Sequence, residues 1–173
     1  MTQLRPCLGW HPFRSLQYRV PAELRPWLGL TGSLTAGLSH LAGCPLHVEI
    51  IAQGWFKPHA DEALGVGLHR GEWAWVREVR LCVHGIPWIE ARSVLPRRAL
   101  VTWARPLYRL GNQPLGALLF RMPHIVRQGL LIRQDPSGCW RRFSLFGPPE
   151  GPQIRVQETY LPDLLHYLSS EHT

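Results

Sequence analysis

The chain has 173 residues, of which 45% are hydrophobic and eight are Trp, so a disordered chain is excluded and one packed domain over residues 1–173 is expected. Its formal net charge is +7, and Lys57 is the only lysine among 19 Lys and Arg residues. No apolar run approaches the length of a membrane span and the first residues lack the layout of a secretory signal, so a cytoplasmic protein without membrane insertion is expected.

The positive charge has two competing explanations. Arginines interleaved with aromatic side chains suit a single-stranded nucleic acid, because they neutralise phosphates and stack on bases. However, the arginines are spread along the whole chain, and no helix-turn-helix or RNA-binding motif is present. Electrostatic steering of a small anionic substrate explains the charge equally well. We therefore expect no nucleic-acid partner.

Periodicity and capping residues divide the first 71 residues into five segments. Ser33 is a suitable N-cap, because its hydroxyl can accept a hydrogen bond from an amide of the first helical turn. In chain order, the predicted segments are an irregular lead-in at 1–20, a short helix at 21–30, a helix from Ser33 to about 42, a strand at 46–56 and a polar loop at 57–71.

The strongest local pattern predicts a β-hairpin. Residues 72–83 and 86–95 both alternate between apolar and polar side chains, and only His84 and Gly85 separate them. A two-residue turn with Gly at its second position is typical of tight hairpins. With such a turn, residue 83 faces residue 86, and residue 77 faces residue 92.

Arg77 interrupts an otherwise apolar face of the first hairpin strand. The other residues of that face are Trp73, Trp75, Val79, Leu81 and Val83. A guanidinium that points into an apolar interior is costly unless it meets a partner or a ligand. The predicted register places Arg92 directly across from Arg77, and opposed like charges destabilise a strand pair unless an anion lies between them. Neutralisation of Arg92 by Glu90 is the structural alternative.

The second half of the chain predicts further strands joined by tight turns. The expected elements are a helix at 96–110 with a kink near Pro106, a short apolar segment at 114–120, strands at 125–134, 139–146 and 153–161, and a helix at about 162–169. In the last strand Glu158 interrupts an apolar face, as Arg77 does. These patterns predict an α+β fold with a single, mainly antiparallel β-sheet, helices on one face and a buried binding site.

The common motifs of metal, nucleotide and covalent chemistry are missing from the sequence. None of the nine histidines has the spacing of a metal site. The four cysteines (Cys7, Cys44, Cys82, Cys139) form no CxxC pair, so reduced thiols are expected rather than disulfide or metal ligands. The GxGxxG, phosphate-loop and GxSxG patterns are absent. We therefore expect neither a metal nor a cofactor.

Four blocks of the sequence together resemble the bacterial chorismate pyruvate-lyase family. The longest is WVREVRLCVHGIPWIEARSVLP at Trp75–Pro96, and the others are SLT at Ser33–Thr35, GNQPLGALLF at Gly111–Phe120 and QETYLP at Gln157–Pro162. The resemblance implies conversion of chorismate to 4-hydroxybenzoate and pyruvate without a cofactor, the first step of ubiquinone biosynthesis. It also implies a fold in which helical flaps close over a buried site.

The same resemblance implies roles for five residues. Arg77 and the backbone amides of Leu34 and Leu115 bind the ring carboxylate. Arg92 holds the enolpyruvyl carboxylate, and Glu158 meets the 4-hydroxyl, so the catalytic set is Glu158, Arg77 and Arg92. Leu34 departs from the family, whose members commonly carry Met there, but a backbone contact survives that change.

Flap closure has a functional consequence that the resemblance also implies. Residues 21–43 and 97–120 are the expected flaps, and their closure slows the escape of product. We therefore expect marked inhibition by 4-hydroxybenzoate, and we expect a monomer. The alternative is a non-catalytic domain that binds small aromatic acids.

Overall fold

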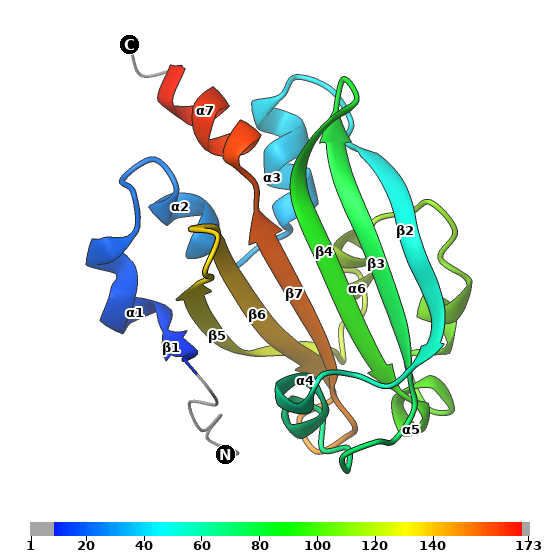
Figure 1. Ribbon diagram of the computed structural model, residues 1–173. Helices are drawn as coiled ribbons and strands as arrows, with labels where there is room; N and C mark the ends of the chain where they lie inside the picture. The colour runs from blue at the N-terminus through cyan, green and yellow to red at the C-terminus, as the bar shows by residue number, and fades with distance from the viewer. Residues whose placement is uncertain (1–8, 171–173) are drawn as a thin grey trace.

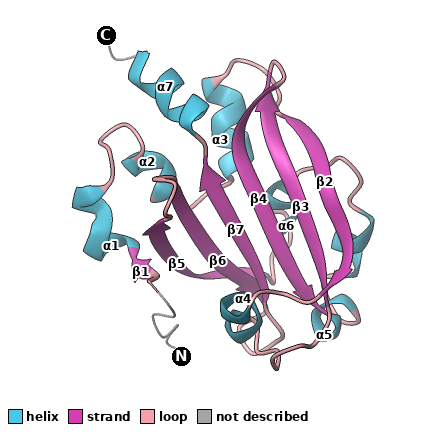
Figure 2. Cartoon of the chain, viewed as in Figure 1, coloured by secondary structure: helices cyan, strands magenta, loops and turns pink. Residues whose placement is uncertain are grey.

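The protein contains one seven-stranded β-sheet in a computed structural model that describes residues 9–170 (Figures 1 and 2). All neighbouring strands are antiparallel, in the order β1-β5-β6-β7-β4-β3-β2. The strands are β1 His11–Pro12, β2 His47–Phe56, β3 Ala74–Val83, β4 Ile86–Pro96, β5 Val126–Gln134, β6 Trp140–Gly147 and β7 Ile154–Tyr160. The predicted α+β class with a single antiparallel sheet is confirmed.

Short helices connect and cover the strands. They are α1 Phe13–Leu16, η1 Gln17–Arg19, α2 Arg25–Leu28, α3 Leu34–Leu41, α4 Ala60–Gly65, α5 Arg97–Leu100, η2 Arg105–Arg109, α6 Leu115–Leu119 and α7 Pro162–Ser170. Ser33 caps α3 as predicted, because its side chain accepts a hydrogen bond from the amide of Ala36 at 3.3 Å.

The β3–β4 hairpin turns at His84 and Gly85, as predicted. Both residues have positive φ, 49° and 81°, which is the backbone of a type I′ turn and matches the twist of paired strands. Gly adopts this conformation without steric cost, and His is among the residues that tolerate the left-handed region.

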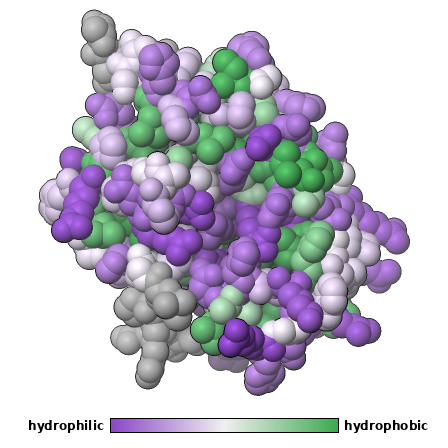
Figure 3. Space-filling model, in the orientation of Figure 1, coloured by the Kyte–Doolittle hydropathy of each residue, from purple (hydrophilic) through white to green (hydrophobic). Residues whose placement is uncertain are grey.

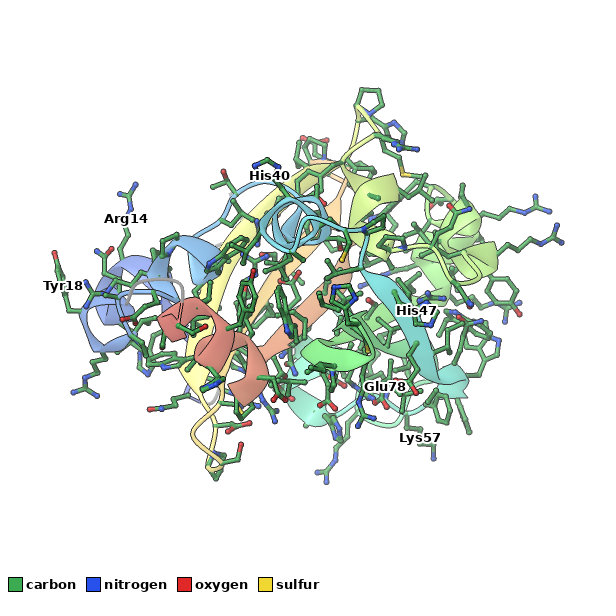
Figure 4. The ribbon with its side chains drawn as sticks, turned by 90° about the horizontal axis from the view of Figure 1, so that it is seen from above. Arg14, Tyr18, His40, His47, Lys57 and Glu78 are labelled. Atoms are coloured by element: carbon green, nitrogen blue, oxygen red, sulfur yellow. The ribbon has the colours of Figure 1, made fainter. Side chains whose placement is uncertain are left out.

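Helices lie on both faces of the sheet. In Figure 1, α3 and α6 lie behind the strands and α4 lies in front of them. Figure 4, seen from above, shows His40 of α3 and Glu78 of β3 on opposite sides of the sheet. The predicted grouping of helices on one face therefore holds for α3 and α6. The exception is α4, which lies within a segment that the sequence predicted as a loop.

The two faces of the sheet carry different side chains. The face beneath α3 and α6, the cavity face, carries Arg77 and its cross-strand neighbours Ser93, Val156 and Ser144. The opposite face carries Glu78 and Arg92, which pair with each other. In the orientation of Figure 1, hydrophilic residues spread across the middle of the opposite face (Figure 3). Within residues 9–170, no helix is both long and apolar enough to cross a membrane.

Three other predicted segments differ in detail from the structure. The part of the lead-in that is described is not irregular, since β1 pairs with β5 and Trp10 is fully buried. Only α2 forms within 21–30, and the helix predicted at 96–110 is divided into α5 and η2. Pro106 lies at the start of η2 and has no N–H to continue an α-helical ladder.

Two apolar clusters cover the cavity face. One cluster joins α3 to the sheet and includes Leu38 and Leu81. The other joins α6 to the sheet and includes Leu119, Leu95 and Ile154. The polar residues of the cavity face belong to neither cluster, which leaves a polar zone between them.

Candidate active site

A cavity occupies the polar zone between the two apolar clusters. Its floor is formed by side chains of β3, β4, β5, β6 and β7, and its roof by the first turns of α3 and α6. It contains about 640 Å³ of space free of protein atoms, including its open mouth. The charged residues that line it are Arg77, Arg127, Arg142 and Glu158.

Arg77 is a buried cation held only by neutral groups. Its side chain on β3 is 3% exposed. Its Nη1 donates to Oε1 of Gln53 at 2.7 Å, and its Nη2 donates to the carbonyl of Gln113 at 3.2 Å. No carboxylate of residues 9–170 forms an ion pair with it, and burial lowers the pKa of Arg77. The guanidinium is therefore fixed in place and available to an anion.

Glu158 lies on the same face as Arg77, two strands away on β7. Its Oε2 accepts a hydrogen bond from Nε of Arg142. Its Oε1 has no protein partner in the described part of the chain, and Glu158 lines the cavity. One carboxylate oxygen is therefore left for a ligand.

Arg142 connects Glu158 to α2 and to the loop that follows it. Its side chain is 2% exposed, and its Nη1 donates to the carbonyls of Trp27 and Leu30 at 2.8 and 3.0 Å. Burial alone lowers the pKa of Arg142, but the carboxylate of Glu158 outweighs burial, so that the pKa is raised. The pair therefore stays ionised and fixes Glu158 beneath the loop.

Leu34 and Leu115 are the first residues of α3 and α6, and both line the cavity. Amides in the first turn of a helix have no carbonyl of the same helix to bind. Two such turns therefore face the cavity from its roof. The structure thus brings four of the five predicted site residues, Leu34, Arg77, Leu115 and Glu158, to one cavity.

The predicted pairing of Arg92 with Arg77 is wrong. Strand β4 has one extra residue, Trp88, and beyond this bulge Arg77 faces Ser93 while Arg92 faces Glu78. A shift of one residue moves a side chain to the other face of a sheet. Arg92 therefore lies on the opposite face and does not line the cavity.

On the opposite face, Arg92 attaches α4 to the sheet. Its Nε and Nη2 donate to the two carboxylate oxygens of Glu62 at 2.7 and 3.1 Å, and its Nη1 donates to Glu78. The alternative pairing with Glu90 does not occur either, because Glu90 binds Arg80 at 3.1 Å. The contacts of Arg92 are those of a structural ion pair.

Two arginines of the cavity, Arg127 and Arg142, escaped the sequence-based predictions. A bulge in β5 between Gln128 and Leu131 turns Arg127 toward the cavity face. The available signal was Gly129, since a glycine inside a strand pattern often marks a bulge, and its φ is 67°. Arg142 gave no such signal, because both faces of its strand carry large apolar residues.

Within residues 9–170, no group of three or more His, Cys, Asp or Glu residues could hold a metal ion. Cys44, Cys82 and Cys139 are free thiols. Cys7 lies outside the described residues.

Comparison with known proteins links this cavity to one family. A family model described as chorismate lyase matches residues 7–167. The chain is 44% identical over 168 residues to a protein of Aromatoleum aromaticum named "Probable chorismate pyruvate-lyase", covering 85% of this chain and 89% of that protein. A protein of Pseudomonas putida with the same name is 33% identical over 175 residues, covering 95% and 94%.

A solved structure shows the same fold in another class of protein. The effector domain of PhnF from Mycobacterium smegmatis superposes with a TM-score of 0.50 and 13% identity, covering 76% of this chain and 90% of that domain. At this identity the likeness concerns the fold alone.

Proposed function

Because the chain belongs to the chorismate lyase family, we propose that it converts chorismate to 4-hydroxybenzoate and pyruvate without a cofactor. The proposal depends on one observation: Arg77, a cation with no carboxylate partner among residues 9–170, and Glu158, an acidic side chain, line the same cavity. This pair suits a ligand with a carboxylate at one end of a ring and a hydroxyl at the other.

In this proposal, Arg77 binds the ring carboxylate. A guanidinium matches a carboxylate with two parallel hydrogen bonds and remains charged at any physiological pH. The amides of Leu34 and Leu115 support the same carboxylate, because the first turns of α3 and α6 face the cavity. Three donors from separate elements then fix one end of the substrate.

Glu158 acts at the other end of the ring. Chorismate carries an enolpyruvyl ether at C3 and a hydroxyl at C4. In the elimination, the bond from C3 to the ether oxygen breaks, C4 loses a proton, and the enolate that leaves takes up one proton at its methylene carbon and becomes pyruvate. We propose that the free oxygen of Glu158 anchors the C4 hydroxyl and relays the proton. Because the product ring is aromatic, the protein mainly fixes the reactive conformer and stabilises the departing oxygen.

The roof of the cavity bears on product release. The loop after α2 is held by hydrogen bonds from Arg127 and Arg142 to the carbonyl of Leu30, and α3 contacts α6 above the ligand space. Closure of these segments excludes water and delays product escape. We therefore propose that 4-hydroxybenzoate inhibits the enzyme strongly. We also propose that the protein is a cytoplasmic monomer and that its product, 4-hydroxybenzoate, enters ubiquinone biosynthesis.

One assay tests the function. Purified protein is mixed with chorismate, and 4-hydroxybenzoate and pyruvate are measured together. Equal amounts of the two products are expected, and a metal chelator should leave the rate unchanged because the proposed steps use only side chains and backbone amides. Tight binding of 4-hydroxybenzoate with no release of pyruvate would instead identify a binding domain, a role that the fold also permits.

A further inference from the structure

The cavity carries more positive charge than a singly charged ligand needs. Its charged lining consists of three guanidiniums, Arg77, Arg127 and Arg142, and one carboxylate, Glu158. Arg142 and Glu158 neutralise each other in an ion pair. Arg77 and Arg127 remain, so the lining has a formal charge of +2. A dianion balances this charge, whereas a monoanion leaves one cation buried without a partner.

Arg127 resembles Arg77 in being held by neutral groups. Its Nε donates to Oγ of Ser144 at 2.7 Å, and its Nη1 donates to the carbonyl of Leu30 at 2.7 Å. Among residues 9–170, it forms no ion pair, and its Nη2 has no protein acceptor. Burial, together with the nearby charge of Arg142, lowers the pKa of Arg127 to about 10. Its charge is therefore costly in the free protein and is stabilised by an anion.

The two cations without carboxylate partners stand at opposite ends of the cavity. Arg77 is on β3 and Arg127 on β5, with β4, β7 and β6 between them. Neighbouring strands lie ~4.8 Å apart, so four steps separate the two backbones by about 19 Å. Both side chains reach into the space between them, and Glu158 lies on the strand midway. A ligand with two separated carboxylates can therefore meet both cations at once.

We infer that Arg127 binds the second carboxylate of the substrate, the enolpyruvyl carboxylate of chorismate, while Arg77 binds the ring carboxylate. The inference rests on the proposed function. It assigns to Arg127 the role that the sequence suggested for Arg92, which lies on the opposite face. Arg142 is less suited to this role, because Glu158 already neutralises its charge, whereas Arg127 forms no ion pair among residues 9–170.

This assignment separates the substrate from the aromatic product. Chorismate has two carboxylates and uses both cations, whereas 4-hydroxybenzoate has one and uses Arg77. Loss of Arg127 should therefore weaken the binding of chorismate but not the binding of 4-hydroxybenzoate. A hydrogen bond to a charged group, when lost, corresponds to about a 10- to 100-fold change in affinity.

The test compares Arg127→Gln with the unaltered protein and with Arg70→Gln, an exposed arginine in the loop before β3 that matches the change in charge. KM for chorismate and Kd for 4-hydroxybenzoate are measured for each protein. For Arg127→Gln we expect KM to rise about 10- to 100-fold while Kd stays within about threefold. Arg70→Gln should change neither constant.

Other outcomes overturn the inference in distinguishable ways. If the affinities for chorismate and 4-hydroxybenzoate fall by the same factor, Arg127 only supports the loop at Leu30. If neither constant changes, Arg127 does not contact the substrate. If Arg127→Gln does not fold, Arg127→Lys decides, because it keeps the charge but loses the planar fork, and only a selective rise in KM for chorismate supports the inference. An unaltered protein that releases no pyruvate would refute the proposed function and this subsite with it.

Discussion

Replacing Arg77 by Met removes a buried guanidinium and leaves an apolar side chain of similar length. Hydrogen bonds to charged groups contribute about 1.5–3 kcal/mol each. Loss of a two-pronged contact should therefore weaken 4-hydroxybenzoate binding by about 3–5 kcal/mol, or roughly a hundred- to several-thousand-fold. Without ligand, the same substitution should stabilise the protein or leave its stability unchanged. Arg77 is 3% exposed, and its guanidinium has no carboxylate partner within residues 9–170, so its desolvation is uncompensated until a ligand binds.

The stability change can be estimated in the same way. Removal of an uncompensated buried charge should leave the free energy of unfolding unchanged or raise it by about 1–2 kcal/mol, after the loss of the bonds to Gln53 and Gln113. For a chain of this length, 1 kcal/mol moves the melting temperature by roughly 2–4 °C. The expected change is therefore between none and a rise of several degrees. This is the stability cost of a site that is preorganised for an anion.

Binding is measured by titration with 4-hydroxybenzoate, and stability by thermal unfolding without ligand. Arg80→Met is the matched control, since Arg80 lies on the same strand but is partly exposed on the opposite face beside Glu90. It should leave the affinity within about twofold, because exposed ion pairs contribute only ~0–1 kcal/mol. If Arg77→Met lowers the melting temperature by several degrees and retains the affinity, the assignment of Arg77 as the carboxylate receptor is refuted.

Three further substitutions test other parts of the structure. Arg92→Gln should destabilise the protein by about 1–3 kcal/mol in urea, because Glu62 stays buried without its cation, while KM for chorismate changes little. Glu158→Gln should lower kcat by about 100- to 10,000-fold, measured by pyruvate release. Burial raises the pKa of Asp61, but Arg155 and Trp10 outweigh burial and lower it; Asp61 therefore stabilises the fold above its unfolded pKa of ~3.9 and loses this effect as the pH falls further. In Asp61→Asn, the free energy of unfolding should therefore fall less steeply as the pH is lowered below about 4.

Each of these expectations has an opposing result. A large rise in KM with normal stability in Arg92→Gln would place Arg92 in the site after all. Normal turnover in Glu158→Gln would remove its carboxylate from the chemistry. If Asp61→Asn leaves the pH dependence of the unfolding free energy unchanged at acid pH, other carboxylates govern acid unfolding.

The sequence was sufficient for the fold class and for four residues of the cavity, of which Leu34 and Leu115 came from the family resemblance alone. Alternation identified the strands, and a charged residue in an apolar stripe singled out Arg77 and Glu158 because burying a charge needs a physical reason. These inferences use side chains of a single strand and need no knowledge of how strands pair. They remained valid for that reason.

The incorrect or missing predictions are those that depend on how neighbouring strands pair. The bulge at Trp88 moved Arg92 to the opposite face, and the bulge at Gly129 brought Arg127 to the cavity face. A bulge adds one residue to one strand, and periodicity alone does not show where that residue is inserted. The two bulges therefore exchanged one arginine of the predicted site for another.

The attachment of the roof has a consequence for the movement of ligands. Leu38 anchors α3 in one apolar cluster, and Leu119 anchors α6 in the other. Separation of the two helices would open a passage while both clusters remain packed. Substrate entry therefore needs only a local fluctuation, which costs less free energy than global unfolding, and a ligand bound between the helices would hold the two clusters together.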